Sequence, residues 1–335
     1  MTTNTSDRLK VGVVGLGKMG VMHACLLNVL PNVKLSGLCD RSRFMTTIAK
    51  HIFRGIAVTD NLDKFEDLDL DAIYVLTPIP SHYSIVKEIF DRNIASNLFV
   101  EKTLASSHRQ SEELLRLAEK HKGINMVGYM KRYAVTFNKA KSFLDQQILG
   151  GLASFDAYAF SSDLADVPIG SSVSKARGGV LEDLGSHLAD LSLWFFGDLD
   201  VTAAKISSRI TQDSEDSVSF EVAGTGDLRG RFEVSWCRSG YHMPEFGLSI
   251  RGANGSLMVT DDEVRLELNG AQTRRWFRQD LDDNVGYLLG GPEYYREDEH
   301  FVKSIASKTK PESDFNSATK VDCLLNEVRC KAVDA

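Results

Sequence analysis

Three glycines near the N-terminus constrain the fold more than any other feature of the sequence. In "VGVVGLGKMGVMH", Gly15, Gly17 and Gly20 form the pattern GxGxxG between a β-branched apolar run and a helical run. Gly15 permits a tight turn, Gly17 lets backbone approach a pyrophosphate, and Gly20 lets the helix pack closely on the strand. The first helical residues, Lys18 and Met19, would then present N–H groups to the phosphates. The spacing therefore predicts a dinucleotide-binding loop.

Apolar and helical runs alternate through the first 130 residues. Strands that alternate with helices pair in parallel through right-handed crossovers, so we expect an α/β fold with a doubly wound parallel sheet. The predicted strands are 9–15, 33–40, 71–78, 96–102 and 124–130, and the clearest helices are 17–30, 81–93 and 107–123.

The pattern changes after about residue 155. Strand-like runs broken by Gly, Asn and Asp follow one another without intervening helices, which indicates an α+β domain with a mainly antiparallel sheet. We therefore expect two domains, 1–130 and 131–335. The last helical runs, 293–311 and 316–333, are expected to pack back on one of them. An open sheet face needs a cover, so a homodimer or a homotetramer is expected.

Charge and composition narrow the classes of function. The chain of 335 residues carries a net charge of −7, so it has no broad basic field for nucleic acid or an anionic membrane surface. No stretch approaches the roughly 20 apolar residues that span a bilayer, and the polar N-terminus lacks a signal-peptide pattern, so a cytoplasmic location is expected. The five cysteines form no CxxC pair and have no histidine at metal spacing, which predicts reduced core residues and no metal site.

Asp40 lies 20 residues after Gly20, at the end of the second predicted strand. An acid at this place binds the ribose diol of the adenosine, and its charge repels the 2′-phosphate of NADP. Arg41 is next to it, and a guanidinium pairs well with that phosphate. NAD is therefore the expected cofactor, and NADP is the alternative because of Arg41.

A second group of polar residues lies in "LEDLGSHLADL", residues 181–191. The run is typical of one amphipathic helix, on which Asp183 and His187, four apart, lie on a single face. Taken alone, such a pair is more often a surface or capping pair than a catalytic one.

Six segments, in order, resemble the Gfo/Idh/MocA superfamily of oxidoreductases. They are "GVVGLGKMG", "LCDRS", "DAIYVLTPIPSH", "VEKTL", "GYMKRY" and "GGVLEDLGSHLADLSLWFFG", and they span nearly the whole chain. The resemblance implies an N-terminal Rossmann domain and a C-terminal open-faced sheet that binds substrate and often forms oligomer contacts. It also implies hydride transfer between a nicotinamide and a sugar or polyol carbon.

The resemblance implies three catalytic residues. The lysine of the family's Glu-Lys-Pro motif falls on Lys102, and the family's aspartate and histidine fall on Asp183 and His187. Oxidising a secondary alcohol requires a base for the hydroxyl proton, and an imidazole with a pKa near neutrality suits that task. Lys102 is expected to hydrogen-bond the reacting oxygen and stabilise negative charge on it. Asp183 is expected to orient the imidazole or bind substrate, and all three are expected to meet over the nicotinamide.

Further ligand contacts are expected near these residues. By resemblance, Thr77 and Pro78 lie against the nicotinamide ribose, and Glu101 lies beside the nicotinamide or is an ordinary strand-end charge. His82 either touches cofactor or substrate or is only a residue of a helix N-terminus. Arg132 either binds an anionic group of the cofactor or substrate or pairs with an acid at the domain interface, and we favour the interface.

One position departs from the family motif. The proline after the lysine is replaced by Thr103. A cis bond before a residue other than proline costs about 2.5 to 4 kcal/mol. We therefore expect a trans Lys102–Thr103 peptide bond.

The leading hypothesis is an NAD(P)-dependent dehydrogenase or ketoreductase that acts on a cyclic polyol, a sugar or a nucleotide sugar. One alternative is an NAD-dependent glycosidase with transient redox chemistry, and another is a non-enzymatic dinucleotide-binding sensor or scaffold. The run 161–179 is expected to form a loop over the cleft, where Asp163, Lys175 and Arg177 are candidate specificity contacts.

Overall fold

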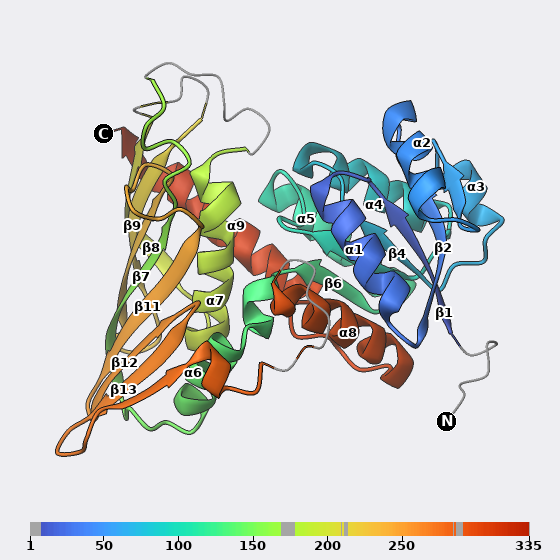
Figure 1. Cartoon of the computed structure of the whole chain (residues 1–335). Coiled ribbons are helices and arrows are strands. Elements are labelled where there is room, and N and C mark those ends of the chain that lie inside the picture. Colours follow the sequence, from blue (N-terminus) through green and yellow to red (C-terminus); the bar gives the residue numbers. More distant parts are fainter. Residues whose placement is uncertain are drawn as a thin grey trace. The chain divides into compact units, whose positions relative to one another are not determined.

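The computed structural model describes residues 8–168, 178–208, 210, 214–283, 285 and 291–334. The chain divides into two units (Figure 1). The first unit consists of Met1–Met130 and Val285–Thr319, and the second of Lys131–Asn284 and Lys320–Ala335.

The first unit is built on a six-stranded parallel sheet with the order β3-β2-β1-β4-β5-β6. The predicted parallel sheet is confirmed, and β3 is the strand that the pattern missed, because three residues are too few to show a period. The order reverses between β1 and β4, which is where ligands bind in doubly wound sheets. The strands are β1 (Leu9–Val14), β2 (Val33–Cys39), β3 (Ala57–Thr59), β4 (Ala72–Val75), β5 (Asn97–Glu101) and β6 (Asn125–Gly128).

Helices flank this sheet, and serine side chains cap the N-termini of two of them, α2 and α5. The hydroxyl of Ser42 accepts a hydrogen bond from the N–H of Met45, and that of Ser107 accepts one from Gln110, as expected of helix N-caps. The helices of the unit are α1 (Lys18–Val29), α2 (Arg43–Ile52), α3 (Asp63–Glu66), α4 (His82–Asp91), preceded by a 3₁₀ turn (Ile79–Ser81), α5 (His108–His121) and α8 (Pro292–Ser307).

The core of the first unit contains a buried polar pair among aromatic rings. Tyr74 on β4 stacks on Phe99 of β5 with 4.5 Å between ring centroids. Next to them, Nδ1 of His23 on α1 lies 2.8 Å from a carboxylate oxygen of Asp298 on α8, and both side chains are fully buried. This contact anchors α8, which comes from the far end of the chain, on α1.

The second unit is built on a nine-stranded sheet with the order β14-β13-β12-β11-β7-β10-β9-β8-β15. Neighbours pair antiparallel except β7 with β10 and β8 with β15, so the expected mainly antiparallel sheet is confirmed. The strands are β7 (Leu152–Phe160), β8 (Asp200–Ser207), β9 (Ser217–Ala223), β10 (Arg229–Ser235), β11 (Glu245–Gly252), β12 (Gly255–Thr260), β13 (Glu263–Leu268), β14 (Arg274–Phe277) and β15 (Ala332–Asp334).

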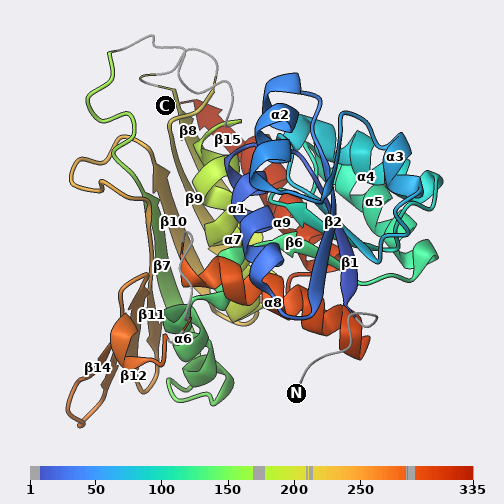
Figure 2. The ribbon, with the colours of Figure 1, turned by 45° about the vertical axis from the view of Figure 1, so that its right-hand side comes forward.

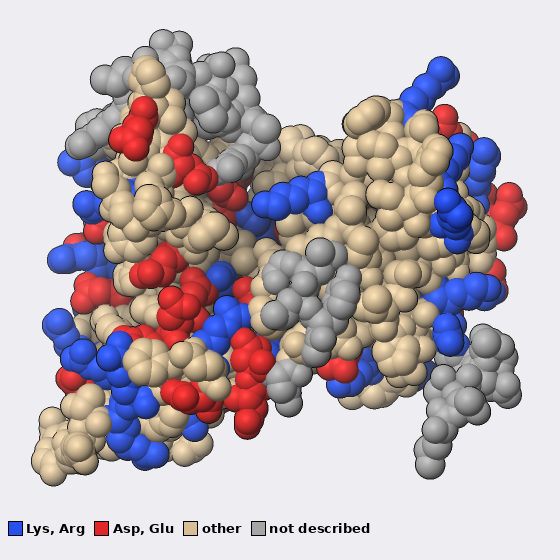
Figure 3. All heavy atoms as spheres, in the orientation of Figure 1, with Lys and Arg blue, Asp and Glu red and all other residues tan. Residues whose placement is uncertain are grey.

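The two faces of this sheet differ in polarity. Phe220 and Phe232 are buried and stack at 4.2 Å on one face, while Glu221 and Arg231 are exposed on the other. Figure 2 shows α6 (Val135–Asp145) and α7 (Ser186–Phe196) on the same side of the sheet, and Figure 3 shows both signs of charge interspersed over the visible surface of this unit.

The second unit also contains 3₁₀ turns at Met130–Tyr133 and Arg278–Asp280 and a π-helical turn (Leu181–Gly185). The boundary between the two units falls inside α9 (Phe315–Lys331).

None of the helices in the described part of the chain has the length and apolarity needed to cross a membrane.

Candidate active site

The glycine turn between β1 and α1 has the geometry that a dinucleotide requires. Gly15 has φ +94°, and a Cβ at this position would lie 2.6 Å from the carbonyl oxygen of Leu76. A Cβ on Gly20 would lie 1.8 Å from the carbonyl oxygen of Gly15, so only glycine lets α1 start this close to the turn. A Cβ on Gly17 would meet no atom within 4 Å. Gly17 therefore borders open space, and as the N-cap of α1 it brings no side chain to the first N–H groups.

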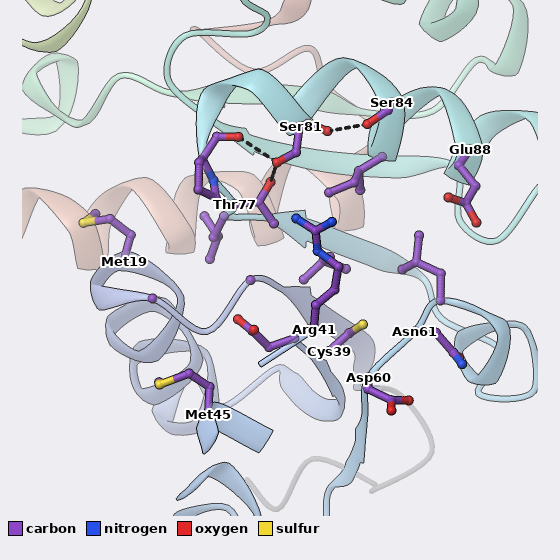
Figure 4. A pocket seen from close by; sticks show the side chains of 18 of the residues that line it. Met19, Cys39, Arg41, Met45, Asp60, Asn61, Thr77, Ser81, Ser84 and Glu88 are labelled. Atoms are coloured by element: carbon purple, nitrogen blue, oxygen red, sulfur yellow. Dashed lines mark hydrogen bonds between the residues drawn. The ribbon is translucent and has the colours of Figure 1, made fainter. Parts of the chain in front are cut away.

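A pocket of about 860 Å³ opens at this turn, at the carboxyl ends of β1, β2 and β4 (Figure 4). Its size is within the range of small-molecule and cofactor sites. Eight of the predicted cofactor residues line it: Gly15, Gly17, Lys18, Met19, Asp40, Arg41, Thr77 and Pro78. Gly20, His82, Glu101, Lys102 and Arg132 are not among its lining residues.

Backbone hydrogen bonds hold the carboxylate of Asp40 at the edge of this pocket. Oδ2 accepts the N–H of Leu16 at 2.6 Å, and Oδ1 accepts the N–H of Ser42 at 2.7 Å. Each carboxylate oxygen keeps a further lone pair after these bonds. The acid is therefore oriented by the protein and still able to accept hydrogen bonds from a ribose diol.

Acidic side chains outnumber basic ones around the pocket. Asp60, Asp63 and Glu88 line it together with Asp40, whereas the basic lining residues are Lys18 and Arg41. Arg92 pairs with both Asp63 and Glu88, so the charges of these two acids are compensated. Figure 4 shows Arg41 pointing into the pocket. Asp60, Asp63 and Glu88 were not predicted, because no sequence motif marks them. They come from the segment after the short strand β3 and from the solvent side of α4.

The loop after β4 is ordered by its own hydroxyls. Ser81 Oγ lies 2.9 Å from Thr77 Oγ1 and 2.7 Å from the carbonyl oxygen of Pro78, to which it donates a hydrogen bond. Thr77, Pro78 and Ser81 all line the pocket. The predicted loop thus contributes to the pocket wall.

His82, the next residue, is fully buried. Its Nδ1 lies 2.8 Å from the carbonyl oxygen of Thr103, and its Nε2 lies 2.7 Å from that of Thr77. Both ring nitrogens face backbone carbonyls, which favours a structural role for His82 at the start of the helix over a contact with cofactor or substrate.

Lys102 follows the last residue of β5. The carboxylate of Glu101 accepts the backbone N–H of Lys102 at 2.5 Å. The Lys102–Thr103 peptide bond is cis, so the prediction of a trans bond was wrong. That prediction considered only the local preference of the bond. In the fold, Thr103 is 1% exposed, its carbonyl faces His82, and its hydroxyl donates to the carbonyl of Ala105.

Asp183 lies in a turn that the sequence pattern did not predict. Leu181–Gly185 is π-helical and leads directly into α7, so the expected single α-helix over 181–191 was wrong. Such π-turns occur frequently at functional sites. The indole N–H of Trp236, a buried residue just after β10, donates to Asp183 Oδ2 at 3.2 Å.

Contacts from distant parts of the chain support this π-turn. The carboxylate of Glu215 accepts the N–H of Leu181 at 3.3 Å, and burial raises the pKa of Glu215. The guanidinium of Arg329 on α9 pairs with Glu182 at 2.9 Å. Glu215 and Trp236 hold the π-turn without belonging to any motif, so the spacing of Asp183 and His187 alone did not reveal them.

His187 occupies the first turn of α7 and is 5% exposed. Its ring packs edge-on against Phe246, with 5.6 Å between centroids. The ammonium of Lys131 lies 4.7 Å from the centroid of the Phe246 ring and 2.5 Å from a carboxylate oxygen of Asp261. Phe246 thus contacts both the candidate base and a buried cation.

Arg132 belongs to the second unit and forms a forked ion pair with Asp190. Its Nε donates to Oδ2 at 2.8 Å and a terminal nitrogen donates to Oδ1 at 2.6 Å, with the two side chains 4% and 0% exposed. This pairing favours a structural role over a contact with the cofactor.

The predicted catalytic residues are divided between the units. Asp183 and His187 belong to the second unit, whereas Lys102 belongs to the first, so their joint action stays a prediction. Among the candidate specificity contacts, Asp163 is exposed in the turn after β7, and Lys175 and Arg177 lie outside the described residues.

Two models of one protein family match most of the chain. The model for the oxidoreductase family with an NAD-binding Rossmann fold matches residues 9–129, and the GFO/IDH/MocA C-terminal domain matches residues 137–258.

Among curated relatives, the uncharacterized oxidoreductase YrbE of Bacillus subtilis is 24% identical over 194 residues, which are 57% of this chain and 55% of that protein. The scyllo-inositol 2-dehydrogenase (NAD+) of the same species is 24% identical over 208 residues, 61% of this chain and 58% of that protein. The chain thus spans little more than half the length of these relatives. A solved structure of levoglucosan dehydrogenase with NADH and levoglucosan superposes with a TM-score of 0.86, 97% of each chain covered and 18% identity, which shows the shared fold.

Proposed function

The chain belongs to the GFO/IDH/MocA oxidoreductase family, and from that premise we propose that it is an NAD-dependent oxidoreductase that transfers hydride between a nicotinamide and a secondary alcohol or ketone carbon. The observation that carries this proposal is the pocket at the switch between β1 and β4. Its glycine turn, its open helix N-terminus and the oriented carboxylate of Asp40 fit a dinucleotide.

NAD is preferred to NADP in this proposal. Asp40 and Asp60 line the pocket beside Lys18 and Arg41. Two further lining carboxylates, Asp63 and Glu88, are already paired with the guanidinium of Arg92 at 2.9 and 2.6 Å, so the preference rests on Asp40. The 2′-phosphate of NADP would bring its negative charge next to the carboxylate of Asp40, and like charges in proximity are unfavourable. Arg41 is the residue through which NADP would still bind.

The chain's own residues handle the proton. When bound, the nicotinamide gives or takes the hydride. His187 is proposed to exchange the hydroxyl proton of the substrate, because a neutral imidazole offers one nitrogen lone pair. Asp183, held by the indole N–H of Trp236, is proposed to orient the imidazole or a substrate hydroxyl. Lys102 is proposed to donate a hydrogen bond to the reacting oxygen and stabilise its negative charge.

The substrate class is proposed to be a cyclic polyol, a sugar or a nucleotide sugar. The names of similar proteins support this class, since one acts on scyllo-inositol and another binds levoglucosan. We further propose a homo-oligomer that buries the polar open face of the nine-stranded sheet.

The test is the fluorescence of NADH or NADPH formed when the purified full chain is mixed with NAD or NADP and with inositols, aldoses or UDP-linked sugars. Lys102→Ala is measured beside Lys34→Ala, which removes an exposed lysine from β2 of the same unit. We expect signal with NAD and one substrate class, a loss of roughly 10²-fold or more in Lys102→Ala, and an unchanged rate in Lys34→Ala.

Two other outcomes would contradict the proposal in distinguishable ways. Release of an aglycone from a glycoside without net change in NAD would identify a glycosidase with transient redox chemistry. Binding of NAD without turnover of any sugar or polyol would favour a sensor or scaffold.

A further inference from the structure

His82 connects two loops of the first unit that both carry predicted site residues. It is the first residue of α4 and its side chain is fully buried. One ring nitrogen faces the loop that follows β4, and the other faces the segment that follows β5. The imidazole is therefore placed between the pocket wall and the neighbourhood of Lys102.

Each ring contact can be a hydrogen bond only if the imidazole donates it. Nδ1 is 2.8 Å from the carbonyl oxygen of Thr103, and Nε2 is 2.7 Å from that of Thr77. Carbonyl oxygens only accept hydrogen bonds. A ring turned over about its axis would bring carbon atoms to these oxygens, at a separation well below the 3.3 to 3.6 Å typical of C–H···O contacts. The observed ring orientation therefore places a nitrogen at each loop, and every N–H that the ring carries is donated to one of the two carbonyls.

Each acceptor belongs to a segment that the proposed function uses. Thr77 lines the dinucleotide pocket, and its hydroxyl bonds to Ser81 on the same wall. Thr103 is joined directly to Lys102 and is itself buried. A shift of either carbonyl would move a part of the predicted site.

We propose that His82 is a positioning residue whose ring ties the loop at Thr77 to the Lys102–Thr103 segment and thereby fixes Lys102 relative to the dinucleotide pocket. Its effect on catalysis rests on the function proposed above. The two contacts of the His82 ring, with the carbonyls of Thr77 and Thr103, are called the tie below; they lie within the first unit and can be measured without turnover.

Protonation decides how many of the two bonds form. A neutral imidazole donates from one nitrogen only, so both bonds coexist only when the ring is protonated. Burial lowers the pKa of His82, the backbone carbonyls of Thr103 and Thr77 raise it, and the charge of Lys102 lowers it, with a net decrease. The tie is thus complete at acidic pH and loses one bond as pH rises through a pKa below the ordinary value of 6.5.

The experiment compares His82→Gln and His82→Leu with His23→Gln in the full chain. His23 is a matched control because it is also fully buried in the first unit, where it pairs with Asp298. For His82→Leu we expect kcat to fall about 10- to 100-fold, as a misplaced catalytic group does, with the substrate KM changed less than about 3-fold. His82→Gln retains an amide donor for one carbonyl and should recover part of kcat. His23→Gln should lower the thermal midpoint while kcat of the folded protein stays within about 2-fold.

Two readouts do not depend on turnover. Nitrogen-15 spectra of the unsubstituted protein should show both ring nitrogens of His82 protonated at the acidic end of a titration and one of them bare once the pH has risen through the lowered pKa to pH 8. The affinity for NAD, followed by protein fluorescence, should decrease on this pH rise in the unsubstituted protein and stay flat in His82→Leu.

The proposal is overturned if His82→Leu lowers stability as His23→Gln does while its kcat and NAD affinity stay unchanged. Failure of the proposed function has a different signature, since the unsubstituted protein would then form no NADH while the ring protonation and NAD affinity remain measurable.

Discussion

The carboxylate of Asp40 accepts a hydrogen bond from the N–H of Leu16 at 2.6 Å, which ties the end of β2 to the middle of the glycine turn. The same side chain lines the dinucleotide pocket. Asp40 therefore shapes the turn and is in place to bind the ribose, and substitutions at Asp40 and its neighbours separate these roles.

Asp40→Asn is expected to change cofactor preference. Asparagine keeps an oxygen that accepts backbone N–H groups but removes the charge that repels a 2′-phosphate. Hydrogen bonds to charged groups contribute about 1.5 to 3 kcal/mol, so NAD should bind about 10- to 100-fold more weakly, and NADP should lose less or gain. Titrations with both cofactors measure the ratio. Adding Arg41→Ala should remove any gain in NADP affinity. An unchanged ratio of NAD to NADP affinity in Asp40→Asn would mean that Asp40 does not bind the ribose.

Gly17→Ala and Gly20→Ala should fail in different ways. The new methyl group of Gly20→Ala would lie 1.8 Å from the carbonyl oxygen of Gly15, so we expect a stability loss of about 1 to 3 kcal/mol from overpacking. Gly17→Ala meets no protein atom within 4 Å, so its unfolding free energy should change by less than about 0.5 kcal/mol. The same methyl would occupy the space of the pyrophosphate and weaken NAD binding. Denaturant unfolding and NAD titration separate the two effects, and normal NAD affinity in Gly17→Ala would argue against a pyrophosphate at this turn.

Trp236→Phe should impair catalysis through Asp183. The phenyl ring keeps most of the buried apolar contact but removes the N–H that holds Asp183 Oδ2 at 3.2 Å. One such bond contributes about 1 kcal/mol to stability, and a poorly oriented carboxylate should lower kcat about 10-fold. Trp276→Phe on β14 is the control, because Trp276 is partly exposed and packs on Phe143, away from the π-turn. Equal kcat values for the two variants would show that the hydrogen bond from the indole N–H to Asp183 does not contribute to catalysis.

Stability should fall as pH rises because of the His23–Asp298 pair. Burial lowers the pKa of His23, but the charge and hydrogen bond of Asp298 raise it further, with a net increase. Burial raises the pKa of Asp298 as well. Both shifts mean that the folded protein binds more protons than the unfolded chain, so the stabilisation is present below pH 6.5 and is lost as pH rises through the raised pKa of His23.

Calorimetry from pH 5.5 to 9 at constant ionic strength measures this dependence. The thermal midpoint of the unsubstituted protein should decrease over the range, and Asp298→Asn should flatten the curve because it removes the charge that holds the proton on His23. Parallel curves for the two proteins would assign the pH dependence to other groups.

The Rossmann half of the fold was predictable because its signals are local. The longer strands and helices show their own periods, and Gly15 and Asp40 belong to one β-α-β unit, formed by β1, α1 and β2, whose chemistry is contained in the spacing of the residues. The wrong predictions have a different origin. The Lys102–Thr103 bond and the turn at Asp183 were judged by local preference, whereas buried contacts from His82, Glu215 and Trp236 surround them in the fold.

The sequence by itself determined the parallel sheet, the glycine turn, the acid at the end of β2 and the class of the second sheet, because periodicity and short-range spacing act within a few tens of residues. Only the tertiary structure decided that β7 lies between β10 and β11, that Asp60 and Glu88 join the pocket of Asp40, and that His82 faces Thr77 and Thr103. These relationships bring together residues far apart in the chain, and they depend on packing and on the need to satisfy buried polar groups, which no local pattern encodes.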